Sequence, residues 1–399
     1  MNAEDKKKKI GILTLNQQLN YGGVLQSYAL QRYLRNQGYD AEVITYWLSE
    51  NNAHLKGHYW FDDSVPLLRR AINAVRNEYR KGFVFAEILR RWRTIKFIQR
   101  YIRMSEKVYR NADELKAIDG YDAIIVGSDQ VWNTWHGHNN PFLLDDIQPQ
   151  IRKIAYAPSF GVKEIPVELQ NEYSVALEKF SALSCREKSG VDMIHELTGR
   201  KSNWVVDPVL LLNQEEWDGN LSIKSASHDY ILCYWLGNFP DIIPTLRQVA
   251  SRKKKKVHLF LQENFILSIW DDPEFRAYWR KEFANDPNIK LFRSAGPKEF
   301  LSQVAGASAV ISDSFHALMF SVIYQKPVRI FINSAEDRKN MSCRMENFCS
   351  KLAMTECLSY NIKLDLEHVS LDTPSYSRNL EDWILESKRF LSYALGKCY

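Results

Sequence analysis

Short apolar runs alternate along this chain with longer segments whose apolar residues recur at helical spacing. Residues 9–15 form a buried-strand pattern, residues 24–36 an amphipathic helix ending before Gly38, and residues 41–46 a second strand. This strand–loop–helix–strand order predicts an α/β protein with parallel sheets. Further strands are expected at residues 121–126, 154–157, 182–186, 230–236, 258–261, 289–292 and 328–331.

The pattern is clearest in residues 309–331, which read AVISDSFHALMFSVIYQKPVRIF. A strand-like start stops at the polar cluster Ser312 to Ser314, and an apolar segment of helical period follows. In open parallel sheets, ligands bind at the loop between a strand's carboxyl end and the next helix, where the helix N–H groups favour anions. His316 falls on the first turn of that predicted helix.

His316 has two interpretations at this position. An imidazole at a helix start often satisfies a neighbouring backbone carbonyl and does nothing more. A titratable group with Asp313 three residues before it is also placed for proton transfer or phosphate binding. The local sequence leaves both interpretations open.

Polar residues also follow four predicted strands in the first half of the chain. Because the carboxyl ends of parallel strands share one edge, we expect these residues to gather there. The two glycines at positions 22 and 23 do not form a GxGxxG fingerprint, but they place flexible backbone where an anion or a sugar could approach. The residues of this predicted site are Asn20, Tyr21, Gly22, Gly23, Ser128, Asp129, Ser159, Arg186 and Lys188.

Residues 50–118 differ in character from the rest of the chain. Residues 65–101 are rich in arginine and aromatic residues at helical spacing, which predicts a solvated helical insertion. The alternative is a basic amphipathic surface that meets anionic lipid or a lipid-linked acceptor, giving peripheral contact with the inner face of a membrane.

The length of 399 residues exceeds one ordinary core and fits two domains of about 150 to 200 residues each. We expect an N-terminal Rossmann-like domain at 1–190 and a C-terminal Rossmann-like domain at 191–375. Residues 376–399 carry an apolar stripe at helical spacing, so they are expected to form a helix that docks on one domain.

Charge and cysteine content narrow the functional classes. A net charge of +5 permits anionic ligands or an anionic membrane surface without requiring nucleic acid. The six cysteines form no CxxC pair and no metal-type cluster with histidine, which is typical of free thiols in a reducing compartment. We therefore expect no metal site. The sequence shows neither a signal segment nor a stretch of about 18 apolar residues, so we also expect a cytoplasmic protein.

Six segments of the chain, which together span about residues 9 to 330, are informative as a set. They read KIGILTLNQQLNYGGVLQSYALQRYLRNQGYDAEVITY, YDAIIVGSDQVWN, RKIAYAPSFG, SCREKSGVDMI, VVDPVLLL and SDSFHALMFSVIYQKPV. In their order and number they resemble the polysaccharide pyruvyl transferase family.

The resemblance implies a GT-B-like fold of two Rossmann-type domains with parallel sheets facing a central cleft. It also implies a transferase that moves a pyruvyl group from phosphoenolpyruvate to two hydroxyls of a sugar, forming a cyclic ketal in a bacterial capsule or exopolysaccharide pathway. Arg186 matches the family's basic donor-binding position, and His316 matches the histidine after the last inner strand. Ser314 stands where the family often has an arginine, so a bidentate partner for carboxylate or phosphate is missing there.

The chemistry of that reaction defines what the site must supply. Phosphoenolpyruvate is strongly anionic, so it needs fixed cations and N–H donors; Arg186 and Lys188 are candidates, and Arg344, Arg338 or Lys339 would replace the arginine missing at Ser314. The methylene carbon must gain a proton and the attacking hydroxyls must lose theirs, and a histidine can do either near neutral pH. We assign this work to His316, with Asp313 and Asp129 as second candidates, and we expect no cofactor beyond the donor itself. For Asp207, which precedes Pro208, a structural turn and a catalytic role both stay open.

Two other functions stay open at this stage. The serine at position 314 also fits a GT-B glycosyltransferase with a nucleotide-sugar donor. A non-catalytic glycan-binding relative would keep the fold and lose the donor.

Overall fold

The computed structural model describes residues 7–15, 20–46, 84–225, 229–237, 239–261, 286–332, 336–361 and 378–396. The chain divides into two compact units. The first comprises Met1–Lys56, Ile98–Leu212 and Ser377–Tyr399, and the second comprises Gly57–Phe97 and Asn213–Tyr376.

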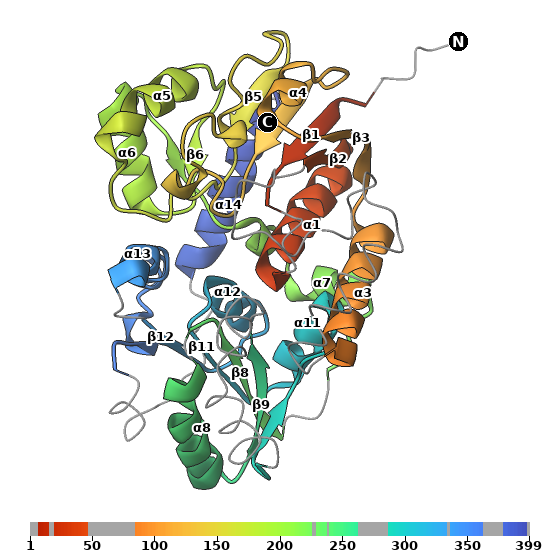
Figure 1. Ribbon diagram of the computed structural model, residues 1–399, viewed down its shortest axis with the longest axis vertical. Coiled ribbons are helices and arrows are strands. Elements are labelled where there is room, and N and C mark those ends of the chain that lie inside the picture. The colour runs from red at the N-terminus through yellow and green to blue at the C-terminus, as the bar shows by residue number, and fades with distance from the viewer. Residues whose placement is uncertain are drawn as a thin grey trace. The chain divides into compact units, whose positions relative to one another are not determined.

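The first unit is built on a five-stranded parallel sheet (Figure 1). Its strand order is β3-β2-β1-β4-β5, so the direction of winding reverses between β1 and β4. All four residues of β4 are buried, as expected for a parallel strand covered on both faces. The strands are β1 (Lys9–Leu13), β2 (Asp40–Tyr46), β3 (Met104–Tyr109), β4 (Ala123–Val126) and β5 (Arg152–Ala155).

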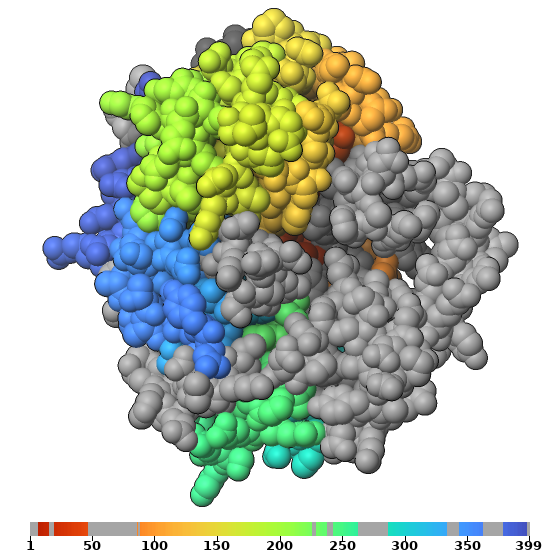
Figure 2. Space-filling view, turned by 60° about the vertical axis from the view of Figure 1, so that its left-hand side comes forward, coloured from red at the N-terminus to blue at the C-terminus, as the bar shows by residue number. Residues whose placement is uncertain are grey.

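Helices and a small second sheet complete the first unit. Figure 2 shows the atoms of α5 and α6, in yellow-green, on its surface. The two-stranded sheet joins β6 (Ser184–Cys185) to β7 (Asn203–Trp204). The other elements are α1 (Tyr21–Asn36), α4 (Ala112–Lys116), η2 (Thr134–His136), η3 (Pro141–Leu143), α5 (Val167–Glu178), α6 (Lys188–Thr198), η4 (Pro208–Leu211) and α14 (Arg378–Ala394).

The boundary between the units lies after Leu212, later than the predicted position 190. The boundary lies later because β7 hydrogen-bonds to β6, and this pairing keeps the intervening helix α6 in the first unit. Local sequence patterns do not show such pairing. The predicted separate segment 376–399 also belongs to the first unit.

The C-terminal helix α14 packs against residues 204–206 and Tyr156 of the first unit. Trp383 Nε1 donates to the carbonyl oxygen of Trp204 at 2.8 Å, and the Val206 amide donates to Ser387 Oγ at 3.0 Å. The ring of Phe390 lies 6.3 Å from that of Tyr156. The apolar stripe predicted for this helix is therefore the face that it buries.

The predicted insertion at 50–118 is only partly helical. Residues 47–83 lie outside the described residues, and α3 (Val84–Tyr101) is a helix as expected. Residues 104–109, however, form β3, an edge strand paired with β2, which corrects the prediction. Its sequence MSEKVY carries charges that suit an edge strand and hide the strand pattern. Trp92 and Lys96 are exposed on α3, and the interpretation of this stretch as a lipid-binding surface stays a prediction.

The second unit is built on a six-stranded parallel sheet in the order β10-β9-β8-β11-β12-β13. Winding reverses between β8 and β11. The strands are β8 (Tyr230–Trp235), β9 (Lys256–Leu261), β10 (Ile289–Leu291), β11 (Ala309–Ser312), β12 (Val328–Phe331) and β13 (Leu358–Ser359); the helices are α7 (Gln214–Leu221), α8 (Phe239–Lys253), α11 (Pro297–Gly306), α12 (Phe315–Ile323), α13 (Glu336–Lys351) and η6 (Thr355–Cys357).

Both sheets follow the Rossmann order, in which strands 3-2-1 lie on one side of the reversal and strands 4-5 on the other. This confirms the predicted class, α/β with two Rossmann-type parallel sheets, as in a GT-B-like fold. The predicted cleft between the domains stays a prediction. In the described ranges, no helix combines the length and apolarity needed to cross a membrane.

Candidate functional site

In the first unit, two glycines allow a close approach of chain segments at the reversal point between β1 and β4. A Cβ atom at Gly23 would lie 2.6 Å from the carbonyl oxygen of Leu15, and one at Gly127 would lie 2.2 Å from that of Tyr156. Gly127 also has a φ of 114°, which residues with a side chain rarely adopt. The first turn of α1 therefore packs directly against the end of β1, next to the loop that follows β4.

Asp129 of that loop joins a buried cluster of charged side chains with Arg186, which follows β6, and Asp207, which precedes η4. Arg186 Nη1 lies 2.8 Å from Asp207 Oδ2, and Arg186 Nη2 lies 3.5 Å from Asp129 Oδ1. The exposed fractions of the three side chains are 1%, 0% and 15% for Arg186, Asp207 and Asp129. Burial lowers the pKa of the guanidinium, but the surrounding carboxylates, Asp207 first, raise it above its ordinary value. Arg186 is thus a fixed cation whose charge is matched inside the protein.

Ser128 and two further polar residues attach this cluster to β1 and α1. Ser128 Oγ lies 3.1 Å from Asp207 Oδ2, and its amide donates to Gln26 Oε1 at 3.1 Å. Gln26 Nε2 in turn donates to Thr14 Oγ1 at 2.8 Å. Gln26 and Thr14 are not among the residues predicted from the sequence, and the sequence alone leaves the role of Asp207 open. A glutamine within the apolar pattern of α1 was the available signal for the first of them.

The structure brings Ser128, Asp129 and Arg186 together, as the sequence analysis expects. Most of this cluster is closed to solvent, and Asp129 is its partly exposed carboxylate. The assignment of Arg186 to donor binding stays a prediction, and in this structure its charge is used to hold two acidic residues in place.

The remaining predicted residues of the first unit have structural contacts. Asn20 caps α1, its Oδ1 accepting the Gly22 amide at 2.8 Å, and Tyr21 is buried in the first turn. Ser159 is fully buried beside the cluster, where its amide donates to the Asp129 carbonyl at 2.8 Å. Lys188 begins α6 and forms an exposed ion pair with Asp192. Their roles in substrate binding stay predictions.

In the second unit, a polar turn joins the two strands at the reversal point. Asp313 Oδ1 accepts the Leu236 amide at 2.7 Å, which ties the loop after β11 to the end of β8. Ser312 Oγ donates to the Tyr234 carbonyl and accepts the Ser314 amide at 3.0 Å. Ser314 is the N-cap of α12, although its Oγ lies 3.5 Å from the Ala317 amide. Asp313 is thus a positioning residue for the helix start.

The first turn of α12 also carries a histidine next to an aromatic ring and an arginine. His316 is buried, and its ring lies edge-on to that of Phe315 with centroids 5.8 Å apart. Arg344 from α13 places its guanidinium carbon 5.7 Å from the centroid of the Phe315 ring, within cation–π range. Phe348, one helical turn further along α13, meets the same ring edge-on at 6.3 Å.

Arg344 therefore brings a positive charge to the helix start where Ser314 lacks one. The side chains of Arg338 and Lys339, the other predicted replacements, lie outside the described residues. In the part of the chain that the structure describes, no group of three histidine, cysteine or acidic side chains is arranged to hold a metal ion.

Comparison with solved structures finds proteins of low sequence identity. One is a UDP-GlcNAc 2-epimerase from Methanocaldococcus jannaschii, with 10% identity, a TM-score of 0.46, and coverage of 86% of this chain and 91% of that chain. Another is a UDP-N-acetylglucosamine 2-epimerase from Rickettsia bellii, with 10% identity, a TM-score of 0.47, and coverage of 98% and 96%. The E. coli heptosyltransferase WaaC with ADP has 10% identity, a TM-score of 0.40, and coverage of 84% and 90%.

Comparison of the sequence with protein families gives a clearer result than comparison with solved structures. No curated protein matches it. Residues 20–335, however, match the family described as polysaccharide pyruvyl transferase. This range covers most of the chain and includes the Arg186 cluster as well as the first turn of α12 with His316. The chain belongs to the polysaccharide pyruvyl transferase family.

Proposed function

We propose that this protein transfers the pyruvyl group of phosphoenolpyruvate to two hydroxyls of a saccharide in a cell-surface polysaccharide precursor, forming a cyclic ketal. The observation that carries the proposal is the first turn of α12, within the matched range, where the Phe315 ring lies against both the His316 imidazole and the Arg344 guanidinium. A general acid–base group and a cation at a helix start are the two elements that an anionic donor requires.

The donor anion is proposed to bind at the start of α12. The first N–H groups of this nine-residue helix carry partial positive charge, and Arg344 adds a full one. Arg344 would then take the place of the arginine that the family often has at position 314. A guanidinium is suited to this role, since it donates two parallel hydrogen bonds to a carboxylate or phosphate.

The reaction forms two carbon–oxygen bonds at C2 of phosphoenolpyruvate and breaks one. The first acceptor hydroxyl attacks C2 as the methylene carbon gains a proton and becomes a methyl group. The second hydroxyl then attacks C2 and phosphate leaves, carrying the remaining proton. His316 is assigned to these proton transfers, with the partly exposed Asp129 as a second candidate. Asp313 and Asp129 are both less suited than His316, because one carboxylate oxygen of each already accepts a backbone amide, from Leu236 and Gln130 respectively.

The test is calorimetric titration of phosphoenolpyruvate into the wild type and into two variants. Arg344→Gln removes a charge-assisted contact and is expected to weaken binding by about 10- to 150-fold, which corresponds to about 1.5–3 kcal/mol. His316→Gln is expected to bind the donor within a few fold of the wild type and to abolish phosphate release once a saccharide acceptor is supplied.

A surface substitution of the same type serves as the control. Arg252→Gln, at the exposed end of α8, is expected to leave binding unchanged. Equal affinity of Arg344→Gln and wild type would refute the donor site. Binding of a nucleotide sugar without binding of phosphoenolpyruvate would refute pyruvyl transfer itself. Arg186→Ala is unsuitable for this test, because it leaves buried carboxylates without a counter-charge.

A further inference from the structure

Two buried cysteines face each other where α13 ends. Cys349 lies in the last turns of α13 and Cys357 in the short helix η6, and their Sγ atoms are 3.6 Å apart. A disulfide bond requires about 2.05 Å between the sulfurs, so they must approach by about 1.5 Å. Both are free thiols in this structure.

The backbone between the two cysteines is held in a tight return. The Met354 amide donates to the Cys349 carbonyl at 2.8 Å, and the Cys357 amide donates to the Met354 carbonyl at 3.1 Å. These bonds keep two residues that are eight positions apart in direct contact. The short distance is therefore fixed by the fold of this turn.

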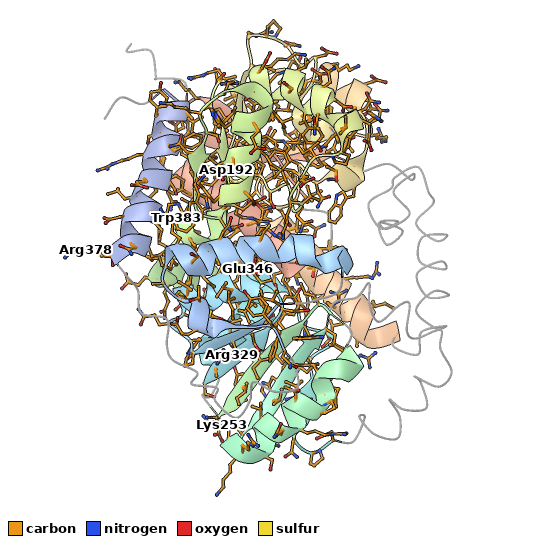
Figure 3. All side chains as sticks on the ribbon, turned by 90° about the vertical axis from the view of Figure 1, so that its left-hand side faces the viewer. Asp192, Lys253, Arg329, Glu346, Arg378 and Trp383 are labelled. Atoms are coloured by element: carbon orange, nitrogen blue, oxygen red, sulfur yellow. The ribbon has the colours of Figure 1, made fainter. Side chains whose placement is uncertain are left out.

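Arg329 on β12 fixes the other side of the pair. Figure 3 shows Arg329 on the strand and Glu346 on α13. Arg329 Nη1 donates to the carbonyl oxygens of Glu356 at 2.6 Å and Leu358 at 3.3 Å, the residues on either side of Cys357. A guanidinium thus lies beside the Cys357 thiol.

This environment makes the two thiols chemically different. The hydrogen bond between the sulfurs raises the pKa of Cys349, which burial raises further, and lowers the pKa of Cys357. Burial and Glu356 oppose the lowering at Cys357, and the Arg329 charge supports it. Cys357 is therefore the thiol of the pair that ionises first. A thiolate next to a second thiol is the arrangement in which an oxidised cysteine is resolved as a disulfide.

We propose that Cys349 and Cys357 form a reversible dithiol–disulfide site that is oxidised by peroxides. The Cys357 thiolate attacks one peroxide oxygen and breaks the O–O bond, which leaves a sulfenic acid, while the departing oxygen takes a proton from solvent and leaves as an alcohol or water. The Cys349 sulfur then attacks the Cys357 sulfur, and the sulfenic oxygen departs as water with the Cys349 proton. Two electrons from the thiol pair thereby reduce one peroxide.

The cysteine pair is connected to the first turn of α12 by direct packing. Cys349 follows Phe348, which meets Phe315 edge-on, and Arg344 lies over the same ring. Closing the sulfur–sulfur gap shifts the end of α13, so oxidation is expected to change the surroundings of His316. This inference needs only the packing of the second unit and is independent of the reaction proposed above.

The experiment treats the reduced full-length chain with one equivalent of hydrogen peroxide and then labels the remaining thiols with N-ethylmaleimide in denaturant. Mass spectrometry is expected to show two fewer labels per chain and a peptide pair linked through Cys349 and Cys357, both reversed by dithiothreitol. In Cys349→Ser the sulfenic acid on Cys357 is expected to persist and to react with dimedone. Cys233→Ser, which removes a buried thiol on β8, is the matched control and is expected to oxidise as the wild type does.

The mapping on the wild type holds even if a variant fails to fold. Linkage of other cysteines, or the same distribution of disulfides in urea as in buffer, would overturn the proposal. The packing connection has its own readout in the imidazole NMR signal of His316. A shift on oxidation that is missing in Cys349→Ser supports it, and an unchanged signal in the disulfide form refutes that connection.

Discussion

Replacing Arg186 by methionine should destabilise the first unit strongly, because Arg186 pairs with a buried carboxylate there. The change keeps most of the side-chain volume and removes the guanidinium that lies 2.8 Å from the Asp207 carboxylate. Asp207 is fully buried, so its carboxylate is left charged in a poorly polarisable environment. Removing one partner of such a pair costs about 3–5 kcal/mol.

The second carboxylate adds little to this figure. Asp129 lies 3.5 Å from the guanidinium and is partly exposed, so water replaces the lost contact at a cost of about 0–1 kcal/mol. For units of about 150–250 residues, each kcal/mol lowers the Tm by about 2–4 °C. We therefore expect the Tm of the first unit to fall by about 6–24 °C in Arg186→Met.

The assay is differential scanning calorimetry together with urea unfolding, with Arg247→Met as a matched control. Arg247 pairs with Asp286 at a similar distance of 2.7 Å. The Asp286 side chain is only 5% exposed, but that of Arg247 is 37% exposed, so water screens this pair and the expected cost is smaller than for Arg186→Met. The double variant Arg186→Met/Asp207→Asn is expected to be more stable than Arg186→Met alone, since the uncompensated charge is gone. An Arg186→Met variant no less stable than Arg247→Met would refute the argument.

Three further predictions concern the stability of the first unit. Burial lowers the pKa of His136 to about 4, so the unfolded chain binds more protons than the folded one between about pH 6.5 and 4, and stability falls with decreasing pH in that window. His136→Gln should remove about 2 kcal/mol of the stability loss between pH 7 and 5, measured by urea unfolding; an unchanged pH slope would contradict this. Gly23→Ala should cost about 1–3 kcal/mol, because its Cβ would meet the Leu15 carbonyl at 2.6 Å. The same change at Gly219 in α7, where nothing lies within 4 Å, should stabilise by about 0.5–1 kcal/mol, and equal effects would disprove the close approach. Trp383→Ala should cost about 3–5 kcal/mol and expose α14 to limited proteolysis. Tyr393→Ala, 79% exposed on the same helix, should change neither stability nor cleavage.

The sequence was informative where one segment contains its own signal. β4 is apolar throughout, β1 and β11 are mostly apolar, and the polar turn before His316 marks the end of a strand without any long-range contact. The sequence did not reveal β3, since its pairing with β2 comes from a charged edge segment far along the chain. The unit boundary was misplaced for the same reason, because β7 belongs to the first unit through its pairing with β6.

The candidate site shows the same division between local and tertiary information. That Ser128, Asp129 and Arg186 come together follows from parallel strands ending at one edge. Arg186 is enclosed by acidic residues because Asp207, 21 positions later, packs against it. The local motif around Arg186 would read the same if the side chain faced solvent. The contact of Arg344 with Phe315 likewise depends on how α13 packs, so the sequence offered Arg344 only as one of three candidates.

The packing of α14 has a consequence for the order in which the protein matures during synthesis. Domains usually fold as they leave the ribosome, with the N-terminal one first. Here the first unit receives its last helix from Arg378–Ala394, which buries Trp383 and Phe390 against residues made much earlier. The second unit is encoded entirely before that helix. A nascent chain should therefore complete its second unit while the first still exposes the apolar surface that α14 covers, and a premature stop near residue 377 would leave that surface open to chaperones or proteases.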